Sequence, residues 1–278
     1  MSSFLLSFRR NRGAFVGAVV LAAVAALAAA APLLFPFSPW DMRGVPFAQP
    51  GQEGFLLGSD NLGRDVAAGI AHGAHVSLLI GAVSTLAALA LGVTVGAIAG
   101  FAGGAIDDAL MRFTELVQTV PSFVLAIVLV AIFTPSLASI VAAIAIVSWP
   151  PVARVVRAEF LSLRRREFVQ AAEVLGRSRA DIVLREILPN ALSPIIVLAS
   201  LMVASAILLE SALSFLGLGD PNRMSWGFMI GAGRSVIRLA WWTSVFPGLA
   251  IFLTVLALNL VGEGLNDALN PRVARKRG

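Results

Sequence analysis

The sequence contains no cysteine, two histidines and one lysine. Without cysteine the chain can form no disulfide, thiolate zinc site or iron–sulfur cluster, and it has no cysteine nucleophile. The histidines, His72 and His75, are too few for a multi-histidine metal centre. The lysine, Lys276, lies in the terminal KRG and follows no glycine-rich loop. Because a Walker A loop needs a lysine to reach the phosphates, an ATP-hydrolysing site of that type is excluded.

Charged residues are also scarce, at 13% of the chain, whereas soluble domains contain roughly 25%. Hydrophobic residues make up 58% of the 278 residues. So few charges could not cover the surface of a water-soluble globule of this size. The composition therefore predicts an all-α protein embedded in the lipid bilayer. On such a protein the net charge of +5 indicates membrane topology and not nucleic-acid binding.

Charge-free runs predict the membrane spans, since a helix needs about 20 residues to cross about 30 Å of hydrocarbon. The runs are Gly13–Trp40, Val66–Ile106, Leu116–Ala153, Ile187–Leu209 and Leu239–Gly262. The third run is long enough for two spans and is interrupted by Pro135 and its neighbours, Thr134 and Ser136. The second begins with a weakly hydrophobic stretch, which predicts an interfacial segment before a span at Val76–Phe101. Six transmembrane helices are therefore predicted.

The distribution of basic residues predicts the orientation. With the N-terminus inside, sixteen Lys and Arg residues fall on inner segments and five on outer segments. Because cytoplasmic loops carry an excess of Lys and Arg, both termini are predicted to be cytoplasmic. A cleavable signal peptide is the alternative for the first run. Its apolar stretch is longer than the usual length of roughly 7–15 residues, and cleavage would leave five spans.

Three regions follow from these spans. Residues 1–75 would hold the first span and a periplasmic loop. Residues 76–266 would form a transmembrane domain of five helices with a charged cytoplasmic loop at 154–188. Residues 267–278 would form a basic cytoplasmic tail.

The charged loop contains eight arginines between Arg154 and Glu186. Four of its residues follow helical i, i+3, i+4, i+7 spacing and share one face: Phe168, Ala171, Ala172 and Leu175. Gly176 suits a helix C-terminal cap, and Ser178 with Asp181 is typical of a capping box at the next helix. The pattern predicts a helix, a glycine turn and a second helix, on which a partner could pack. The alternative is a solvated loop whose charge only reflects topology.

The segment QAAEVLGRSRADIVLREILPN, residues 170–190, resembles the EAA loop of ABC-importer permeases. Gln170 replaces the glutamate of that motif. The matching positions are Ala171, Ala172, Gly176, Leu188 and Pro189. Three further segments resemble the C-type permease subunit of dipeptide, oligopeptide and nickel ABC importers: LGSDNLGRD (Leu57–Asp65), LLESALSFLGLG (Leu208–Gly219) with the SWG that follows, and FPGLAIFLTVLALNLVGEGLNDALNPR (Phe246–Arg272). The resemblance covers nearly the whole chain.

This resemblance implies a type I ABC-importer permease-like bundle in the bacterial inner membrane. It implies a sister permease, two ATPase subunits and an extracytoplasmic substrate-binding protein as partners. The chain would translocate di- or oligopeptides or a related small solute without catalysis or a cofactor of its own, since the ATPases would use ATP and Mg²⁺. Its coupling loop would dock into an ATPase through residues Glu167, Gln170, Ala171, Ala172, Gly176, Leu188 and Pro189.

Two further features concern the spans. Gly92, Gly96 and Gly100 repeat at a spacing of four, which lets helices approach closely, either within the bundle or between permeases. Glu210 lies near the outer end of the fifth span and is a candidate for lining the substrate path, because acids within membrane segments are functional suspects.

Two other classes of protein are alternatives to a permease. An ion-coupled secondary carrier would work without an ATPase and would be expected to hold acids near the middle of the membrane, which this sequence lacks. An intramembrane serine protease would need a histidine on a span, whereas His72 and His75 precede the predicted second span.

Overall fold

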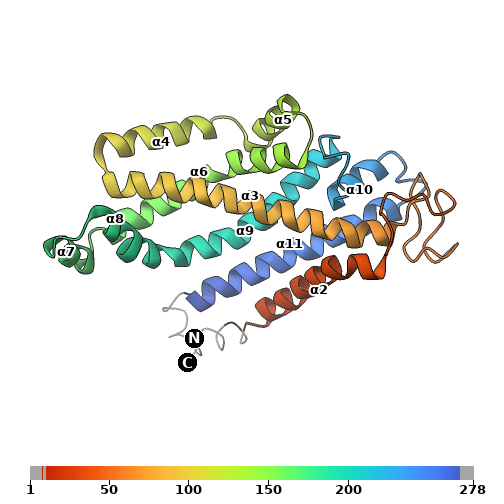
Figure 1. Ribbon diagram of the computed structural model, residues 1–278, viewed down its shortest axis with the longest axis horizontal. Helices are drawn as coiled ribbons and strands as arrows, with labels where there is room; N and C mark the ends of the chain where they lie inside the picture. Colours follow the sequence, from red (N-terminus) through yellow and green to blue (C-terminus); the bar gives the residue numbers. More distant parts are fainter. Residues whose placement is uncertain (1–7, 9–10, 270–278) are drawn as a thin grey trace.

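The computed structural model describes residue 8 and residues 11–269 (Figure 1). Within these residues the chain is helical, with two isolated β-bridges in the loop before the second long helix and no strand. The helices are α2 (Arg12–Leu34), α3 (Val66–Ala102), α4 (Gly104–Gln118), α5 (Ser122–Ile132), α6 (Leu137–Leu163), α7 (Glu167–Val174), α8 (Arg179–Asp181), the π-helix η1 (Ile182–Ile187), α9 (Leu188–Phe215), α10 (Trp226–Gly233) and α11 (Trp242–Leu269).

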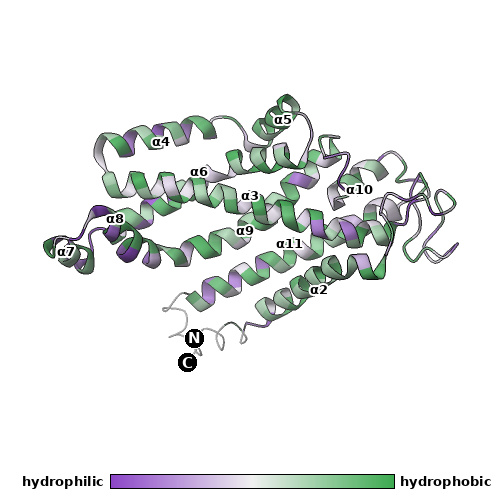
Figure 2. Ribbon diagram, in the orientation of Figure 1, coloured by the Kyte–Doolittle hydropathy of each residue, from purple (hydrophilic) through white to green (hydrophobic). Residues whose placement is uncertain are grey.

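Five helical stretches of the described chain are long and apolar enough to cross a membrane: α2, α3, α6, α8 to α9, and α11. They run along the long axis of the molecule and carry mostly hydrophobic residues (Figure 2). The pair α4 and α5 passes the same test as one unit, but with a bend of 81° between the two helices. The predicted total of six spans is therefore reached with this bent pair counted as one span.

The second span begins ten residues earlier than predicted. Helix α3 is continuous from Val66, and the side chain of Asp65 caps it by accepting hydrogen bonds from the N–H groups of Ala67 and Ala68. The segment before Val76, predicted to be interfacial, is thus part of the same helix as the span, and the predicted region boundary at residues 75 and 76 falls inside that helix. At 1.5 Å per residue α3 is about 55 Å long, which exceeds the thickness of the hydrocarbon layer.

The bend between α4 and α5 was not predicted. Pro121 precedes α5, and a proline both lacks the N–H that a continuing helix needs and restricts the residue before it. Helix α4 was also missed, because Asp107, Asp108 and Arg112 give it the appearance of a loop. The apolar run beginning at Leu116 is therefore divided between the last turn of α4 and the whole of α5.

The predicted break at Thr134 to Ser136 is confirmed. Thr134 has a φ of 65°, and the side chain of Ser136 caps α6 by accepting from the N–H of Ser139. The hydroxyl of Ser139 in turn lies 3.0 Å from the Ser136 nitrogen, which completes a capping box. These local bonds end one helix and start the next within four residues.

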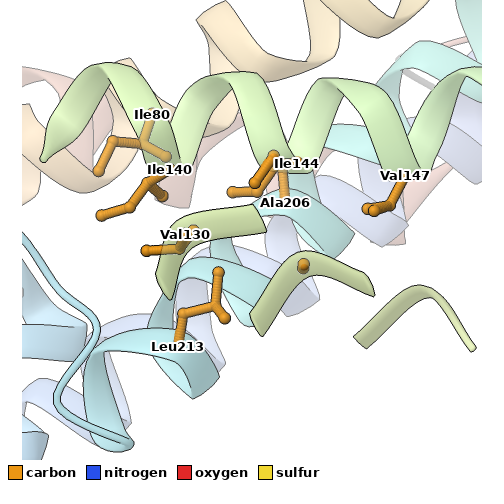
Figure 3. Close-up of a cluster of buried hydrophobic side chains, with 9 residues drawn as sticks. Ile80, Val130, Ile140, Ile144, Val147, Ala206 and Leu213 are labelled. Carbon is orange, nitrogen blue, oxygen red and sulfur yellow. The ribbon is translucent and has the colours of Figure 1, made fainter. Parts of the chain in front are cut away.

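The bundle is held together by buried aliphatic contacts among non-adjacent helices. One cluster joins Ile80 of α3, Val130 of α5, Ile140 and Ile144 of α6, and Leu213 of α9 (Figure 3). Because four helices contribute to this single cluster, α5 is fixed against α6 and α9 despite its short length.

The described chain begins and ends at the same end of the bundle. The side-chain amide of Asn11 donates a hydrogen bond to Asp267 Oδ2, at 3.2 Å, and this contact joins the start of α2 to the end of α11. Both lie toward the end that carries α7 (Figure 1). The predicted tail, residues 267–278, begins inside α11, and residues 270–278 lie outside the described residues.

Candidate functional site: the charged loop and the neighbouring cavity

The charged loop forms the predicted helix, glycine turn and second helix. Helix α7 ends at Val174, and Gly176 adopts a left-handed φ of 73°. The N–H of Gly176 bonds to the carbonyl of Glu173 at 3.0 Å, and that of Arg177 bonds to the carbonyl of Ala172 at 3.1 Å. This pair of bonds is a Schellman cap, which requires a residue that tolerates positive φ.

A π-helix that was not predicted connects the loop to the next span. Ser178 caps α8 by accepting from the N–H of Asp181, and η1 then continues directly into α9. Pro189 lies in the first turn of α9 and lacks the N–H that would bond to the carbonyl four residues earlier. Pro189 is therefore the residue in the sequence from which the change between π-helical and α-helical hydrogen bonding could have been predicted.

The apolar residues of the loop divide into a buried and an exposed set. Val169 and Ala172 are buried against α6 and η1 in a cluster that includes Phe160 and Ile182. The exposed apolar side chains are Phe168, Val174, Leu175 and Leu184, and we call them the exposed loop set. Of the four residues predicted to share one face, Ala172 packs inward and Phe168, Ala171 and Leu175 are exposed, so the predicted packing of a partner on this helix stays a prediction.

The other predicted loop residues include both exposed and partly buried side chains. Glu167, Gln170 and Ala171 are exposed on α7, and Pro189 is exposed at the start of α9. Leu188 is partly buried against the same cluster as Val169. The structure thus brings the predicted positions together around one short helix, with most of their side chains turned away from the bundle.

Ion pairs within the loop hold the glycine turn against η1. Arg177 Nη1 donates to Glu186 Oε1 at 2.5 Å and lies 3.6 Å from Asp181 Oδ2. Arg185 Nε lies 3.0 Å from Asp181 Oδ1. These pairs are solvent-exposed, so each contributes at most about 1 kcal/mol. Their main effect is to neutralise charge around the exposed loop set.

The end of α6 that leads into the loop is fixed to α3 and α4. Arg157 donates two hydrogen bonds to Asp107, Nε to Oδ1 at 2.5 Å and Nη2 to Oδ2 at 2.6 Å. Arg164 Nη1 donates to the carbonyl of Phe101 at 3.0 Å. The end of α6 nearest α7 is therefore joined by side-chain hydrogen bonds to both α3 and α4.

Replacing Asp107 by alanine should lower the free energy of unfolding by about 1–3 kcal/mol, because Asp107 is 7% exposed and the variant would leave the Arg157 guanidinium without its partner. The measurement is the thermal unfolding midpoint in mild detergent. Asp108→Ala is the matched control, since Asp108 is an adjacent, exposed aspartate without an ion pair in the described chain. Equal shifts in both variants would contradict a structural role for the Asp107–Arg157 pair.

The glycine stripe lies at the contact between α3 and α6. A Cβ added at Gly100 would lie 2.6 Å from Phe160 Cβ and 2.8 Å from the Arg157 carbonyl oxygen. A Cβ added at Gly92 would lie 2.7 Å from the Trp149 carbonyl oxygen. A Cβ added at Gly96 would lie still closer to the backbone of Ala153. The glycine stripe therefore lies at a helix contact inside the bundle, which is one of the two predicted locations; the other was a contact between permeases.

Glu210 does not line a cavity wall. Its side chain is 1% exposed, and its Oε1 accepts hydrogen bonds from the hydroxyls of Ser214 at 2.8 Å and Ser225 at 2.7 Å. Ser225 caps α10, so the carboxyl group joins α9 to that short helix. Serine hydroxyls therefore surround the carboxyl group of Glu210 in this structure, and its place in the substrate path stays a prediction.

The neighbouring residue, Leu209, instead borders a cavity of about 550 Å³ enclosed by the α4–α5 turn, α6 and α9. Its wall is mainly aliphatic and contains four polar side chains, Gln118, Ser122, Ser148 and Ser205, with no charged residue. Pro151, the second of two adjacent prolines in α6, also faces this cavity. The cavity could not be predicted from the sequence, because its wall combines residues from four helices.

Two protein-family models match this chain. The model of the binding-protein-dependent transport system inner membrane component matches residues 92–275, and the model of the N-terminal transmembrane domain of oligopeptide transport permease C matches residues 1–50. The chain is 39% identical over 280 residues to the di/tripeptide transport system permease protein DppC of Pseudomonas aeruginosa, covering 98% of this chain and 92% of that protein. It is 41% identical over 266 residues to the dipeptide transport system permease protein DppC of Alkalihalophilus pseudofirmus, covering 95% and 88%.

A solved structure shows the same fold. The inward-facing MetNI methionine ABC transporter matches with a TM-score of 0.61 and 15% sequence identity, over 73% of this chain and 96% of that chain. At this level of identity the likeness concerns the arrangement of helices alone. It places the bent pair, the charged loop and the cavity in a fold that ABC importers use.

Proposed function

The chain belongs to the binding-protein-dependent transport system inner membrane components, and on that premise we propose that it passes di- or oligopeptides through the membrane. It is a multi-pass inner-membrane permease, the translocation subunit of an ATP-driven importer. The peptide cargo is supported by relatives whose names specify dipeptide or di/tripeptide transport. It is also supported by a cavity whose wall is uncharged, because such a wall does not discriminate among charged side chains.

The observation that carries the ATPase-coupling proposal is the exposed loop set. Leu175 is 79% exposed and Val174 is 88% exposed at the tip of a strongly charged loop. Apolar side chains gathered on an exposed surface mark an interaction site. The proposed coupling surface comprises this set together with the predicted residues Glu167, Gln170, Ala171, Gly176 and Pro189, while the predicted residues Ala172 and Leu188 pack behind it.

The proposed assembly has the usual parts of a binding-protein-dependent importer: a sister permease beside the bundle, two ATPase subunits that use ATP and Mg²⁺ below α7, and a substrate-binding protein at the opposite end. The α7 end would face the cytoplasm, together with both chain termini, because the excess of Lys and Arg lies there. Within this assembly, residues 1–75 would serve as the peripheral span and outer loop, residues 76–266 as the transport domain, and residues 267–278 as a basic tail.

The assembly is tested by purifying the tagged chain from native membranes in mild detergent and identifying the accompanying proteins by mass spectrometry. We expect a second permease and one or two Walker-type ATPases. Peptide uptake by the reconstituted complex should require ATP. Recovery of the chain alone, with ion-driven uptake in proteoliposomes without ATP, would instead support a secondary carrier.

Leu175→Asp should remove most of the co-purifying ATPase, because it places a charge at the centre of the apolar contact. Burying an unpaired carboxylate costs several kcal/mol, which corresponds to a loss of more than about a hundredfold in affinity. The matched control is Leu56→Asp, since Leu56 is also a largely exposed leucine, at 73%, but lies in the loop before α3, at the other end of the bundle. ATPase recovery unchanged in Leu175→Asp would remove this residue from the coupling surface.

A further inference from the structure

A second large cavity lies at the end of the bundle opposite α7. It has a volume of about 470 Å³ and is bordered by the last turns of α2, the first turns of α3 and the segment that precedes α10 (Figure 1). The cavity for cargo described above is bordered by α4, α5, α6 and α9, so the two cavities share no helix. The site at the α2–α3 cavity is therefore independent of the translocation wall.

The lining of the α2–α3 cavity combines apolar and polar side chains. The apolar residues are Ala28, Ala29 and Pro32 of α2, Val76 of α3, Pro39 and Met224. The polar and basic residues are Trp40, His72, His75, Asn222 and Arg223. A ligand that complements this lining needs an apolar portion and an anionic, hydrogen-bond-accepting portion at one end.

The basic groups of this cavity are available for a ligand. The guanidinium of Arg223 and the imidazole of His75 form no hydrogen bond or ion pair with any described residue. His72 Nε2 lies 3.1 Å from the carbonyl oxygen of Phe35, and this contact orients its ring. That contact occupies an N–H of His72, because a carbonyl oxygen only accepts, whereas the ring N–H of His75 is available to donate to an anion.

Acidic groups do not compete for this site. None of the residues that line the cavity is acidic. Two carboxylates lie close by in the sequence, and both accept hydrogen bonds from the backbone. Asp41 Oδ2 accepts from the N–H of Ser38 at 3.1 Å, and Asp220 accepts from the N–H groups of Asn222 and Leu137, each at 2.8 Å.

The position of the cavity points to the chemical class of the ligand. It lies at the ends of two helices that are long and apolar enough to span a membrane, and its lining includes Trp40, a residue type enriched at membrane–water interfaces. Basic side chains close to a membrane surface attract anionic lipid headgroups. We propose that this cavity binds a phospholipid with a net negative headgroup, with its phosphate on Arg223 and His75 and its acyl chain along α2.

A metal ion fits this site less well. The described chain contains no group of three or more His, Cys, Asp or Glu side chains that could hold a metal, and His72 already contacts a backbone carbonyl. A bound phospholipid also fills the space between α2 and α3 at the point where α2 is exposed on most of its surface. The lipid would therefore complete the packing of the peripheral span.

The test uses the permease together with the subunits that accompany it in mild detergent, analysed by native mass spectrometry. The complex is first exchanged into zwitterionic lipid and then titrated with phosphatidylglycerol or with phosphatidylcholine. We expect wild-type complexes to retain phosphatidylglycerol in preference to phosphatidylcholine. Arg223→Gln should weaken phosphatidylglycerol retention about fivefold, the effect of losing one basic group near a headgroup. His75→Gln should weaken it less, because an amide still donates a hydrogen bond.

Arg238→Gln is the matched control, since Arg238 is an exposed arginine in the segment between α10 and α11 that does not border the cavity. Its retention of phosphatidylglycerol should equal that of the wild type. Equal retention by Arg223→Gln and the wild type, or equal loss in both arginine variants, would overturn the proposal. Displacement of the lipid by millimolar inorganic phosphate would also overturn it, by identifying the site as one for a free anion.

Discussion

Gly176→Val should uncouple ATP hydrolysis from peptide uptake. The φ of 73° at Gly176 is unfavourable for a β-branched residue by about 1–2 kcal/mol, which changes the population of the turn roughly 5–30-fold. No atom lies within 4 Å of the Cβ that the substitution adds, so the effect arises from the backbone and not from a steric clash. Uptake and ATP hydrolysis are measured in the same proteoliposomes, and we expect uptake to fall while hydrolysis persists.

Gly176→Asn is the control for this experiment, because asparagine enters the left-handed region more readily than other residues with a side chain. We expect it to retain most of the uptake. If Gly176→Val transported peptides at the wild-type rate, the Schellman cap between α7 and α8 would have no part in coupling.

Gly96→Ala should lower the free energy of unfolding by about 1–3 kcal/mol, since α3 and α6 would have to separate to admit one methyl group. The added Cβ would overlap the carbonyl oxygen of Ala153 and lie 2.8 Å from Val156 Cβ. The denaturant or thermal midpoint of the purified protein measures this effect. Transport should decline with it, because α6 also carries Arg157, which pairs with Asp107 of α4 next to the coupling loop.

Gly248 provides the contrasting substitution. It is a helical glycine in α11. The atom nearest to a Cβ added at this position is Ile230 Cδ1, at 3.9 Å. Gly248→Ala should be neutral or stabilising by up to about 1 kcal/mol, because alanine favours the helix. A similar destabilisation in both variants would show that the glycine stripe has no special packing role.

Features specified by neighbouring residues could be predicted from the sequence. The break at Pro135 and the turn at Gly176 depend on φ preferences and caps within a few residues, so their chemistry is legible in the chain itself. Helix α4, by contrast, could not be predicted from neighbouring residues. Its Asp107 is neutralised by a partner on α6, and no local pattern in the sequence indicates that partner.

Features that depend on distant contacts could not be predicted in the same way. Spacing showed that α7 has apolar residues, but the packing of Val169 against Phe160 decides which face turns inward. Glu210 was expected at the substrate path, and its enclosure depends on a hydroxyl at Ser225, fifteen residues away. The cavity walls likewise depend on how four bent helices meet.

The adjacent prolines of α6 bear on how one passage could accept cargo of varied sequence. Pro150 and Pro151 have no N–H, so the carbonyl oxygens one turn earlier, at Ile146 and Val147, lose the donors that an uninterrupted helix supplies. Val147 and Pro151 both border the 550 Å³ cavity. If such an oxygen faces the cavity, it could accept a hydrogen bond from any main-chain amide or ammonium that passes, whatever side chain follows it. Recognition by the permease backbone would then persist through every substitution of the lining side chains, and only replacement of the prolines themselves would remove it.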